Sequence, residues 1–280
     1  MTVLDVLQST TAYFKKREIE SARLNAEHLL AHSLGKKRIE LYLEFERPLA
    51  EAELAPLREL VRRRGQGEPL QHLLGTVEFC GRTFLCDKRA LIPRPETEEL
   101  VELLMAEYGT RDPDFRVLDV GTGSGVIALS LAAAWPDARI HAVDLSENAL
   151  SLARENAARL ELTDRVQFKE SDLLQCVADV YDLIVANLPY VPAGERTQVS
   201  REVLRDPDAA VFDGPAGDET IRRLIETAPP HLKLGGLLAL EIGIGQADGL
   251  CAFLKERNYH DISSRQDYAG VTRFLLARYG

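Results

Sequence analysis

The sequence lacks any apolar stretch long enough to cross a membrane, and it lacks any closely spaced pair of cysteines. A spanning helix needs about 18 or more consecutive apolar residues, and the N-terminus has no apolar signal-peptide core. Four cysteines occur without a C-x-x-C pair, the usual spacing in zinc sites: Cys80, Cys86, Cys176 and Cys251. We therefore expect a cytoplasmic protein with reduced thiols, no membrane contact and no metal site.

Positive charge is also scarce. The chain carries 34 Lys and Arg residues against 44 Asp and Glu residues, a net charge of −10. Residues 76–280 hold 22 of the basic residues and 33 of the acidic ones, a net charge of −11. Because proteins that grip a phosphate backbone present a basic face, we expect no direct binding of nucleic acid.

The first 75 residues have helical patterning. Thr2 and Asp5 have the spacing of a capping box, which predicts a first helix through Phe14. Apolar residues at helical spacing predict a second helix that Gly35 ends, and two further helices follow at 39–45 and 51–64. Helices this short are stable only when packed together, so residues 1–75 are predicted to form a small helical bundle.

Residues 76–92 change to β-rich composition. The runs Thr76–Cys80 and Thr83–Cys86 flank Gly81-Arg82, which predicts a β-hairpin that links two domains. Two prolines, Pro93 and Pro95, then fix an extended segment. Thr97 is expected to cap a helix over 98–108, at the start of a larger domain, 93–280.

A glycine-rich turn marks the larger domain. An apolar run ends at Asp119, and glycines follow at 121, 123 and 125, directly before a helical segment that stops at Pro136. Strand, glycine turn and helix in this order are typical of a nucleotide-binding βαβ unit. The G-x-G-x-x-G dinucleotide spacing is broken by Val126, and no lysine of a P-loop is present.

Strand and helix patterns then alternate, which predicts a parallel sheet covered on both faces. The first predicted strand ends at Asp119, and the next three end in Asp144, Asp172 and Asn187. Ligands of open α/β sheets bind beyond the carboxyl ends of the strands. We therefore expect these side chains to meet at one crevice, where Asp144 can accept hydrogen bonds from a ribose diol.

The chemistry is predicted to lie in Asn187-Leu188-Pro189-Tyr190. A planar nitrogen is a poor nucleophile because its lone pair is delocalised. Hydrogen bonds from its NH₂ to the Asn187 side-chain oxygen and to the carbonyl of Leu188 would orient it and favour the positive charge that develops on it. Tyr190 would stack on the planar group. The motif fits a glutamine amide and the exocyclic amine of a base equally well.

Over nearly its full length the chain resembles the HemK/PrmC family of protein-(glutamine) methyltransferases. The resemblance rests on the helical N-terminal part, on the glycine motif and on Asn187 to Tyr190, and its most specific stretch is Ile92-Pro93-Arg94-Pro95-Glu96-Thr97-Glu98. It implies a Rossmann-like class I methyltransferase sheet, with a small N-terminal helical bundle that recognises the substrate and a linking β-hairpin.

By the same resemblance, the cofactor is S-adenosylmethionine, with S-adenosylhomocysteine as product. The partners are peptide chain release factors, methylated on the glutamine of their Gly-Gly-Gln motif, which places the reaction in translation termination. Catalysis would fall to Asn187, Pro189 and Tyr190, and the target would contact Asn187, Leu188, Pro189 and Tyr190. The residues implied in cofactor binding are Gly121, Thr122, Gly123, Ser124, Gly125, Asp144, Asp172, Leu173 and Asn187.

Two departures from the family pattern keep other hypotheses open. Leu188 replaces the usual first proline of Asn-Pro-Pro-Tyr, and Asp206 replaces a glutamate before Pro207. Asn-Leu-Pro-Tyr also resembles the motif of ribosomal RNA adenine dimethyltransferases, so an adenine-specific nucleic-acid methyltransferase is the alternative. A third hypothesis is a non-enzymatic scaffold, which the intact glycines and Asn187 oppose.

Overall fold

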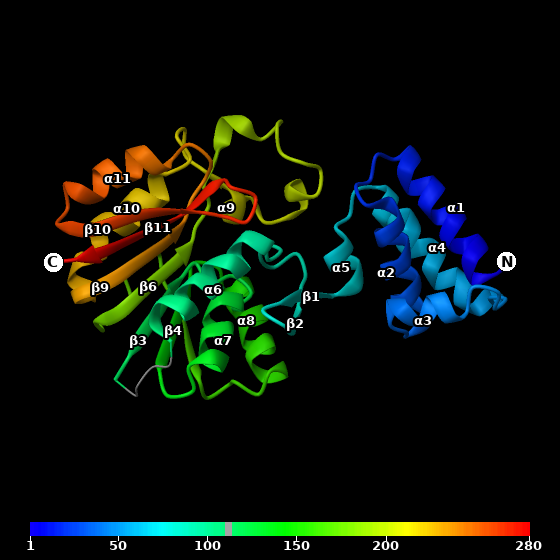
Figure 1. Cartoon of the computed structure of the whole chain (residues 1–280), viewed down its shortest axis with the longest axis horizontal. Helices are drawn as coiled ribbons and strands as arrows, with labels where there is room; N and C mark the ends of the chain where they lie inside the picture. Colours follow the sequence, from blue (N-terminus) through cyan, green and yellow to red (C-terminus); the bar gives the residue numbers. More distant parts are fainter. Residues whose placement is uncertain (110–113) are drawn as a thin grey trace. The chain divides into compact units, whose positions relative to one another are not determined.

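The computed structural model describes residues 1–109 and 114–280, which divide into two compact units, Met1–Thr76 and Val77–Gly280 (Figure 1). Each unit has a hydrophobic core of its own. Within the described ranges, no helix is both long and apolar enough to cross a membrane.

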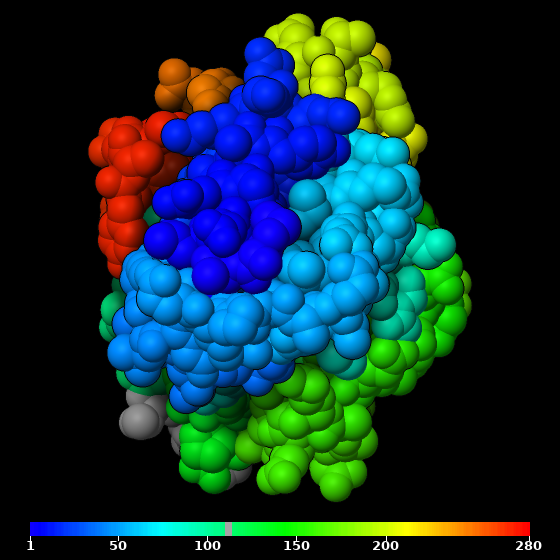
Figure 2. Space-filling view, turned by 90° about the vertical axis from the view of Figure 1, so that its right-hand side faces the viewer, coloured from blue at the N-terminus to red at the C-terminus, as the bar shows by residue number. Residues whose placement is uncertain are grey.

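The first unit is helical, as predicted, and appears in blue and light blue in Figures 1 and 2. The capping box is confirmed, because Thr2 Oγ1 accepts from the Asp5 N–H at 3.2 Å and Asp5 Oδ2 accepts from the Thr2 N–H at 2.9 Å. The helices are α1 (Val3–Lys16), α2 (Ala22–Leu34), α3 (Arg38–Leu43), α4 (Glu51–Gly65) and α5 (Leu70–Leu74).

Apolar faces of these helices form the core of the first unit, with Leu7, Phe14 and Leu29 fully buried. A hollow of about 280 Å³ remains between α1 and α4. Its walls include Val6, Tyr13, Leu57 and Val61.

The second unit begins with the predicted hairpin, β1 (Thr76–Phe79) and β2 (Arg82–Leu85). Its turn lies at Cys80-Gly81, one residue earlier than expected, and both residues have positive φ, 46° and 69°. Two-residue hairpin turns favour such angles because they match the strand twist. Phe79 and Phe84 pack edge to face, with ring centroids 6.0 Å apart, inside the core of this unit. The hairpin is therefore part of the second unit's core.

A seven-stranded sheet forms the centre of the second unit. Its strands, in spatial order, are β10 (Tyr259–Gln266), β11 (Thr272–Tyr279), β9 (Leu232–Glu241), β6 (Tyr181–Asn187), β3 (Arg116–Val120), β4 (Arg139–Asp144) and β5 (Val166–Glu170). The sheet is parallel from β9 to β5, while β11 runs antiparallel to β9 and β10 antiparallel to β11. The alternating pattern that predicted this sheet is confirmed.

Helices cover both faces of the sheet (Figure 1). The core on one face includes buried residues of α6 (Pro95–Tyr108), α7 (Val126–Ala134) and α8 (Glu147–Arg159). The core on the other face includes residues of α10 (Glu219–Thr227) and α11 (Ala247–Lys255). Burial on both sides explains why the central strands are almost wholly apolar.

The order of the strands fixes where a ligand can bind. From β3 the chain proceeds outward to β4 and β5, then returns to β6 on the other side of β3. The loops after β3 and β6 therefore leave in opposite directions and open a crevice at their carboxyl ends. A further loop beyond β6 is held by a short parallel pair, β7 (Val191–Pro192) and β8 (Phe212–Asp213), with α9 (Asp208–Val211) before β8.

Candidate active site

A cavity of about 300 Å³ opens at this crevice, within the second unit. Its size lies at the lower end of the range for small-molecule sites. Of the residues predicted to bind cofactor or target, those lining it are Gly121, Thr122, Gly123, Ser124, Asp144, Asp172, Leu173, Asn187, Leu188 and Pro189. Arg89, Arg94 and Thr97, from the segment before α6, line it as well.

The glycine turn needs glycine for two different reasons. Gly121, Gly123 and Gly125 have φ of 73°, 57° and 84°, in the left-handed region that side chains disfavour. A Cβ on Gly121 would lie 2.8 Å from Leu188 Cδ2, whereas one on Gly123 would meet only Ala90 Cβ, at 3.9 Å. The space beside Gly123 is thus the cavity itself, and a side chain there would fill it.

Asp119, at the end of β3, supports this turn from beneath and does not line the cavity. Its Oδ2 accepts from Thr122 Oγ1 at 2.6 Å and from the Ala128 N–H at 3.1 Å. Burial raises the pKa of this fully enclosed carboxyl to about 7. The expectation that Asp119 shares the crevice with the other strand ends is therefore wrong, because the side chain turns inward to the N-terminus of α7.

Asp144 is already oriented for a ligand. Its Oδ2 accepts from the Gly123 N–H and its Oδ1 from the Ser146 N–H, both at 2.8 Å. Each carboxylate oxygen can accept a second hydrogen bond, so both can still receive the hydroxyls of a diol. Burial raises the pKa of Asp144, and hydrogen bonds from the backbone of Ser146, Gly123 and Leu145 oppose that rise.

Asp172 and Leu173 lie in the loop after β5, which ends at Glu170, two residues before the predicted strand end. Asp172 Oδ2 accepts from Arg223 at 2.8 Å and from Gln175 at 3.0 Å, so this oxygen has protein partners. Leu173 has a φ of 48° and is nearly buried. A left-handed leucine is strained, and such residues cluster at binding sites.

The Asn187 amide points its oxygen away from its protein partner. Asn187 Nδ2 donates to Thr97 Oγ1 at 2.9 Å, and the described residues place no donor on Asn187 Oδ1. Tyr190 does not line the cavity, and its hydroxyl donates to Glu241 Oε1 at 3.3 Å. Burial raises the pKa of Tyr190, which therefore stays protonated. The stacking expected of Tyr190 stays a prediction.

Sequence reasoning missed the polar partners of this motif. Thr97 was expected to cap a helix over 98–108, but α6 begins at Pro95 and Thr97 lies within its first turn. The Thr97 side chain instead donates to Glu241 Oε2 at 2.7 Å. The one feature of the sequence that could have predicted this contact is Glu241, an acid at the end of β9, at the same edge of the sheet as Asn187.

The arginine of the Pro-Arg-Pro segment is also tied into the site. Arg94 Nη2 lies 2.7 Å from Asp206 Oδ2, and Asp206 Oδ1 accepts from the Ile92 N–H at 3.2 Å. Burial raises the pKa of Asp206 to about 6, while Arg94 opposes the rise. Asp206, shorter than the family's usual glutamate, thus still reaches Arg94 and joins this segment to the loop after β6.

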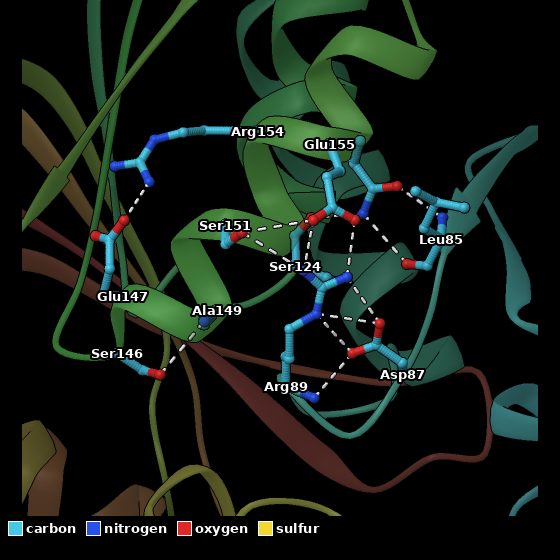
Figure 3. A network of polar contacts seen from close by, with 11 residues as sticks. Leu85, Asp87, Arg89, Ser124, Ser146, Glu147, Ala149, Ser151, Arg154 and Glu155 are labelled. Carbon is cyan, nitrogen blue, oxygen red and sulfur yellow. Dashed lines mark hydrogen bonds and ion pairs between the residues drawn. The ribbon is translucent and has the colours of Figure 1, made fainter.

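The chain before Arg94 is anchored to α8 and the glycine turn (Figure 3). Asn156 on α8, fully buried, accepts from the Leu85 N–H at 2.6 Å and donates to the carbonyls of Leu85 and Ser124. Arg89 bridges Asp87 and Glu155. The part of the cavity wall that includes Arg89 is therefore fixed by side chains rather than by a sheet.

These features fit S-adenosylmethionine. A positively charged sulfonium without phosphate suits a cavity with carboxylates and a left-handed glycine turn that exposes its backbone. Within the described ranges, no group of three or more His, Cys, Asp and Glu residues is placed to hold a metal ion.

Comparison with known proteins supports this fit. Residues 5–75 match the family model described as PrmC N-terminal domain, and residues 96–214 match Methyltransferase small domain. The structure of a 16S rRNA N2 G1207 methyltransferase of T. thermophilus, in complex with AdoMet and guanosine, superposes with a TM-score of 0.53. It is 19% identical and covers 73% of this chain and 50% of its own, which supports the fold alone.

Two relatives match throughout. The release factor glutamine methyltransferase of Geobacter sulfurreducens is 40% identical over 100% of this chain and 97% of its own. That of Chlorobaculum tepidum is 39% identical over 98% of this chain and 96% of its own. Sheet, glycine turn and matched domains define a class I S-adenosylmethionine-dependent methyltransferase. Within that class, the chain belongs to the release factor glutamine methyltransferase family.

We predict that Asp144→Ala weakens binding of S-adenosylmethionine by roughly 1–3 kcal/mol, because ribose hydroxyls would lose their buried acceptors. Isothermal titration calorimetry measures the difference. Asp137→Ala, an exposed aspartate before β4, is the matched control and should bind like the unaltered chain. Equal affinities for all three proteins would remove Asp144 from the cofactor site.

Proposed function

We propose that the chain transfers a methyl group from S-adenosylmethionine to the side-chain amide nitrogen of the glutamine in the Gly-Gly-Gln motif of peptide chain release factors. The observation that carries this proposal is the Asn187 amide, which lines the cavity with its NH₂ bonded to Thr97, while no donor among residues 1–109 and 114–280 reaches its oxygen. Full-length similarity to release factor glutamine methyltransferases supports the choice of target.

The chain's own contribution is to bind and orient. S-adenosylmethionine supplies an electrophilic methyl group on its sulfonium. The Asn187 Oδ1 and the Leu188 carbonyl accept the two N–H bonds of the glutamine amide, which holds the nitrogen and favours positive charge on it. Pro189 lines the same wall, and its fixed φ restricts the loop. Pro189 thus supports the position of the Leu188 carbonyl.

For the cofactor we propose contacts from the glycine turn, Asp144 and the loop after β5. Residues 121–124 line the cavity, and Asp144 receives the ribose hydroxyls. Gly125 lies outside the lining, and a Cβ there would be 3.1 Å from Ala153 Cβ on α8. Asp172 bonds Arg223 and Gln175 through Oδ2, and its Oδ1 has no hydrogen-bond partner among the described residues. Leu173 lies beside it on the wall of the cavity.

The charge balance favours a protein target over a nucleic acid. Residues 76–280, which hold the cavity, carry a net charge of −11. An RNA approaching this crevice would be repelled, whereas a glutamine on a protruding protein loop needs no basic field. Because release factors act on ribosomes, we place the reaction in the cytoplasm.

We also propose that the first unit, Met1–Thr76, contacts the release factor. It matches the PrmC N-terminal domain model and carries an apolar hollow between α1 and α4. Its 12 basic and 11 acidic residues in 1–75 nearly cancel, so we expect its contacts to be mainly apolar.

The first prediction of this function concerns the motif. Asn187→Ala should lower kcat by about 10²-fold or more, because a positioned acceptor is lost. Leu188→Pro should keep the rate within about tenfold, because proline supplies the same carbonyl and only restricts φ. Single-turnover methylation of a release factor measures both, and an unchanged rate for Asn187→Ala would reduce the motif to a turn.

The second prediction concerns the target. Labelled S-adenosylmethionine is offered to the chain with release factors, with release factors whose Gly-Gly-Gln glutamine is replaced by alanine, and with ribosomal RNA. We expect label only on the unaltered release factor. Label on RNA adenine and none on any release factor would refute the proposal and favour the nucleic-acid alternative.

The third prediction concerns the first unit. A chain that starts at Val77 should bind S-adenosylmethionine with unchanged affinity, because the cavity lies within 77–280. Its kcat/KM for a whole release factor should fall about tenfold or more, because binding contacts remote from the reacting amide are lost. Equal kcat/KM with and without residues 1–76 would limit this unit to stability.

A further inference from the structure

Four side chains from separate parts of the second unit form one hydrogen-bonded line beside the cavity. Asn187 Nδ2 donates to Thr97 Oγ1 at 2.9 Å, and Thr97 Oγ1 lies 2.7 Å from Glu241 Oε2. The other carboxylate oxygen, Glu241 Oε1, accepts from the Tyr190 hydroxyl at 3.3 Å. Both ends of the motif Asn187 to Tyr190 therefore meet at a single carboxyl group.

The centre of this line is almost fully shielded from water. Glu241 is 1% exposed and Thr97 is 3% exposed. Glu241 and Asn187 are register partners on the neighbouring parallel strands β9 and β6. Burying a carboxyl costs free energy unless hydrogen bonds compensate, and the proposed methyl transfer gives Glu241 itself no direct contact with either ligand.

The donor and acceptor properties of these groups fix the direction of each hydrogen bond in the line. An ionised carboxylate can only accept hydrogen bonds, so Thr97 and Tyr190 must both donate to Glu241. The Thr97 hydrogen is then committed, and its oxygen can only accept from Asn187. The Asn187 NH₂ is thereby turned toward Thr97 and Oδ1 toward the cavity. The two ends of an asparagine amide are otherwise nearly equal in shape.

We propose that Glu241, acting through Thr97, is the positioning residue that sets which end of the Asn187 amide faces the target nitrogen. The inference rests on the proposed methylation of an amide, whose NH₂ needs an acceptor. With the amide reversed, Asn187 would present a second NH₂ to the NH₂ of the target, and neither could accept. Through its contact with Tyr190, Glu241 also holds the other end of the loop.

The charge of Glu241 sets a pH dependence. Burial, with Glu96 as a neighbouring carboxylate, raises the pKa of Glu241 to about 7, while Thr97, Tyr190 and the Arg273 guanidinium oppose the rise. Below this pH Glu241 gains a proton and can itself donate to Thr97. Thr97 can then donate to Asn187 instead of accepting from it, and the orientation of the Asn187 amide is no longer fixed. We therefore expect kcat to fall as the pH drops through about 7.

The test compares Thr97→Val, Thr97→Ser and Glu241→Gln. Thr97→Val keeps the shape but removes the hydroxyl, and should lower kcat for release factor methylation by about tenfold or more with little change in KM. Thr97→Ser restores the hydroxyl and should recover most of that loss. Glu241→Gln should lower kcat and flatten the acid limb of the pH profile. Thr227→Val, on the exposed part of α10, is the control.

A second readout does not need turnover. The side-chain NH₂ signals of Asn187, assigned by their loss in Asn187→Ala, should shift in Thr97→Val and return in Thr97→Ser in two-dimensional ¹H–¹⁵N NMR spectra. Fluorescence of Trp135, the single tryptophan and buried in the core, shows that each variant is folded.

The outcomes separate the two proposals. An unaltered chain that methylates no release factor refutes the proposed function, while the NMR shifts still test the line of hydrogen bonds. An active chain whose Thr97→Val and Glu241→Gln variants keep the full kcat refutes the positioning role alone. Unshifted Asn187 signals in Thr97→Val refute it as well.

Discussion

The hydrogen bonds of Asp119 beneath the glycine turn are the constraint on which the cofactor side of the site depends. One carboxylate oxygen holds Thr122 of the turn and the Ala128 N–H in the first turn of α7. The strand, the turn and the helix are thereby fixed to one another at a single buried point. The Gly123 N–H is held in turn by Asp144, on the next strand. The turn is thus shaped by two acids before any ligand binds, which lowers the entropy that binding must overcome.

The target side of the site is likewise organised by a buried carboxyl group near the end of a strand. Glu241 is the last residue of β9 and Asp119 is the last but one of β3, and burial raises the pKa of each carboxyl to about 7. Asp119 organises a backbone turn, whereas Glu241 organises side chains, through Thr97 and Tyr190. Asp206 adds a third buried acid, which joins Arg94 and Ile92 to the loop after β6. The stretch Ile92 to Glu98 supplies partners to two of these acids.

The sequence sufficed for those parts of the fold that depend on local pattern. Alternating strands and helices, the capping box at Thr2 and the strand ends at Asp144 and Asn187 were all predicted correctly. Contacts between distant segments could not be predicted this way, because no local pattern records them. Thr97 lies 144 residues from Glu241 in the chain, and its position directly before the expected helix suggested a cap. Asp119 was misplaced for a related reason: a residue at a strand end can face either the crevice or the helix behind it.

Gly121 and Leu188 pack closely, and this contact connects the glycine turn on the cofactor side of the site with the loop after β6 on the target side. The Leu188 side chain is 5% exposed and occupies the space that a Cβ on Gly121 would need. The loop that would cradle the cofactor and the loop that would present the target can therefore pack in van der Waals contact only because Gly121 has no Cβ. A side chain at position 121 would have to displace Leu188, so the glycine that shapes the turn also fixes how closely the loop after β6 can approach it.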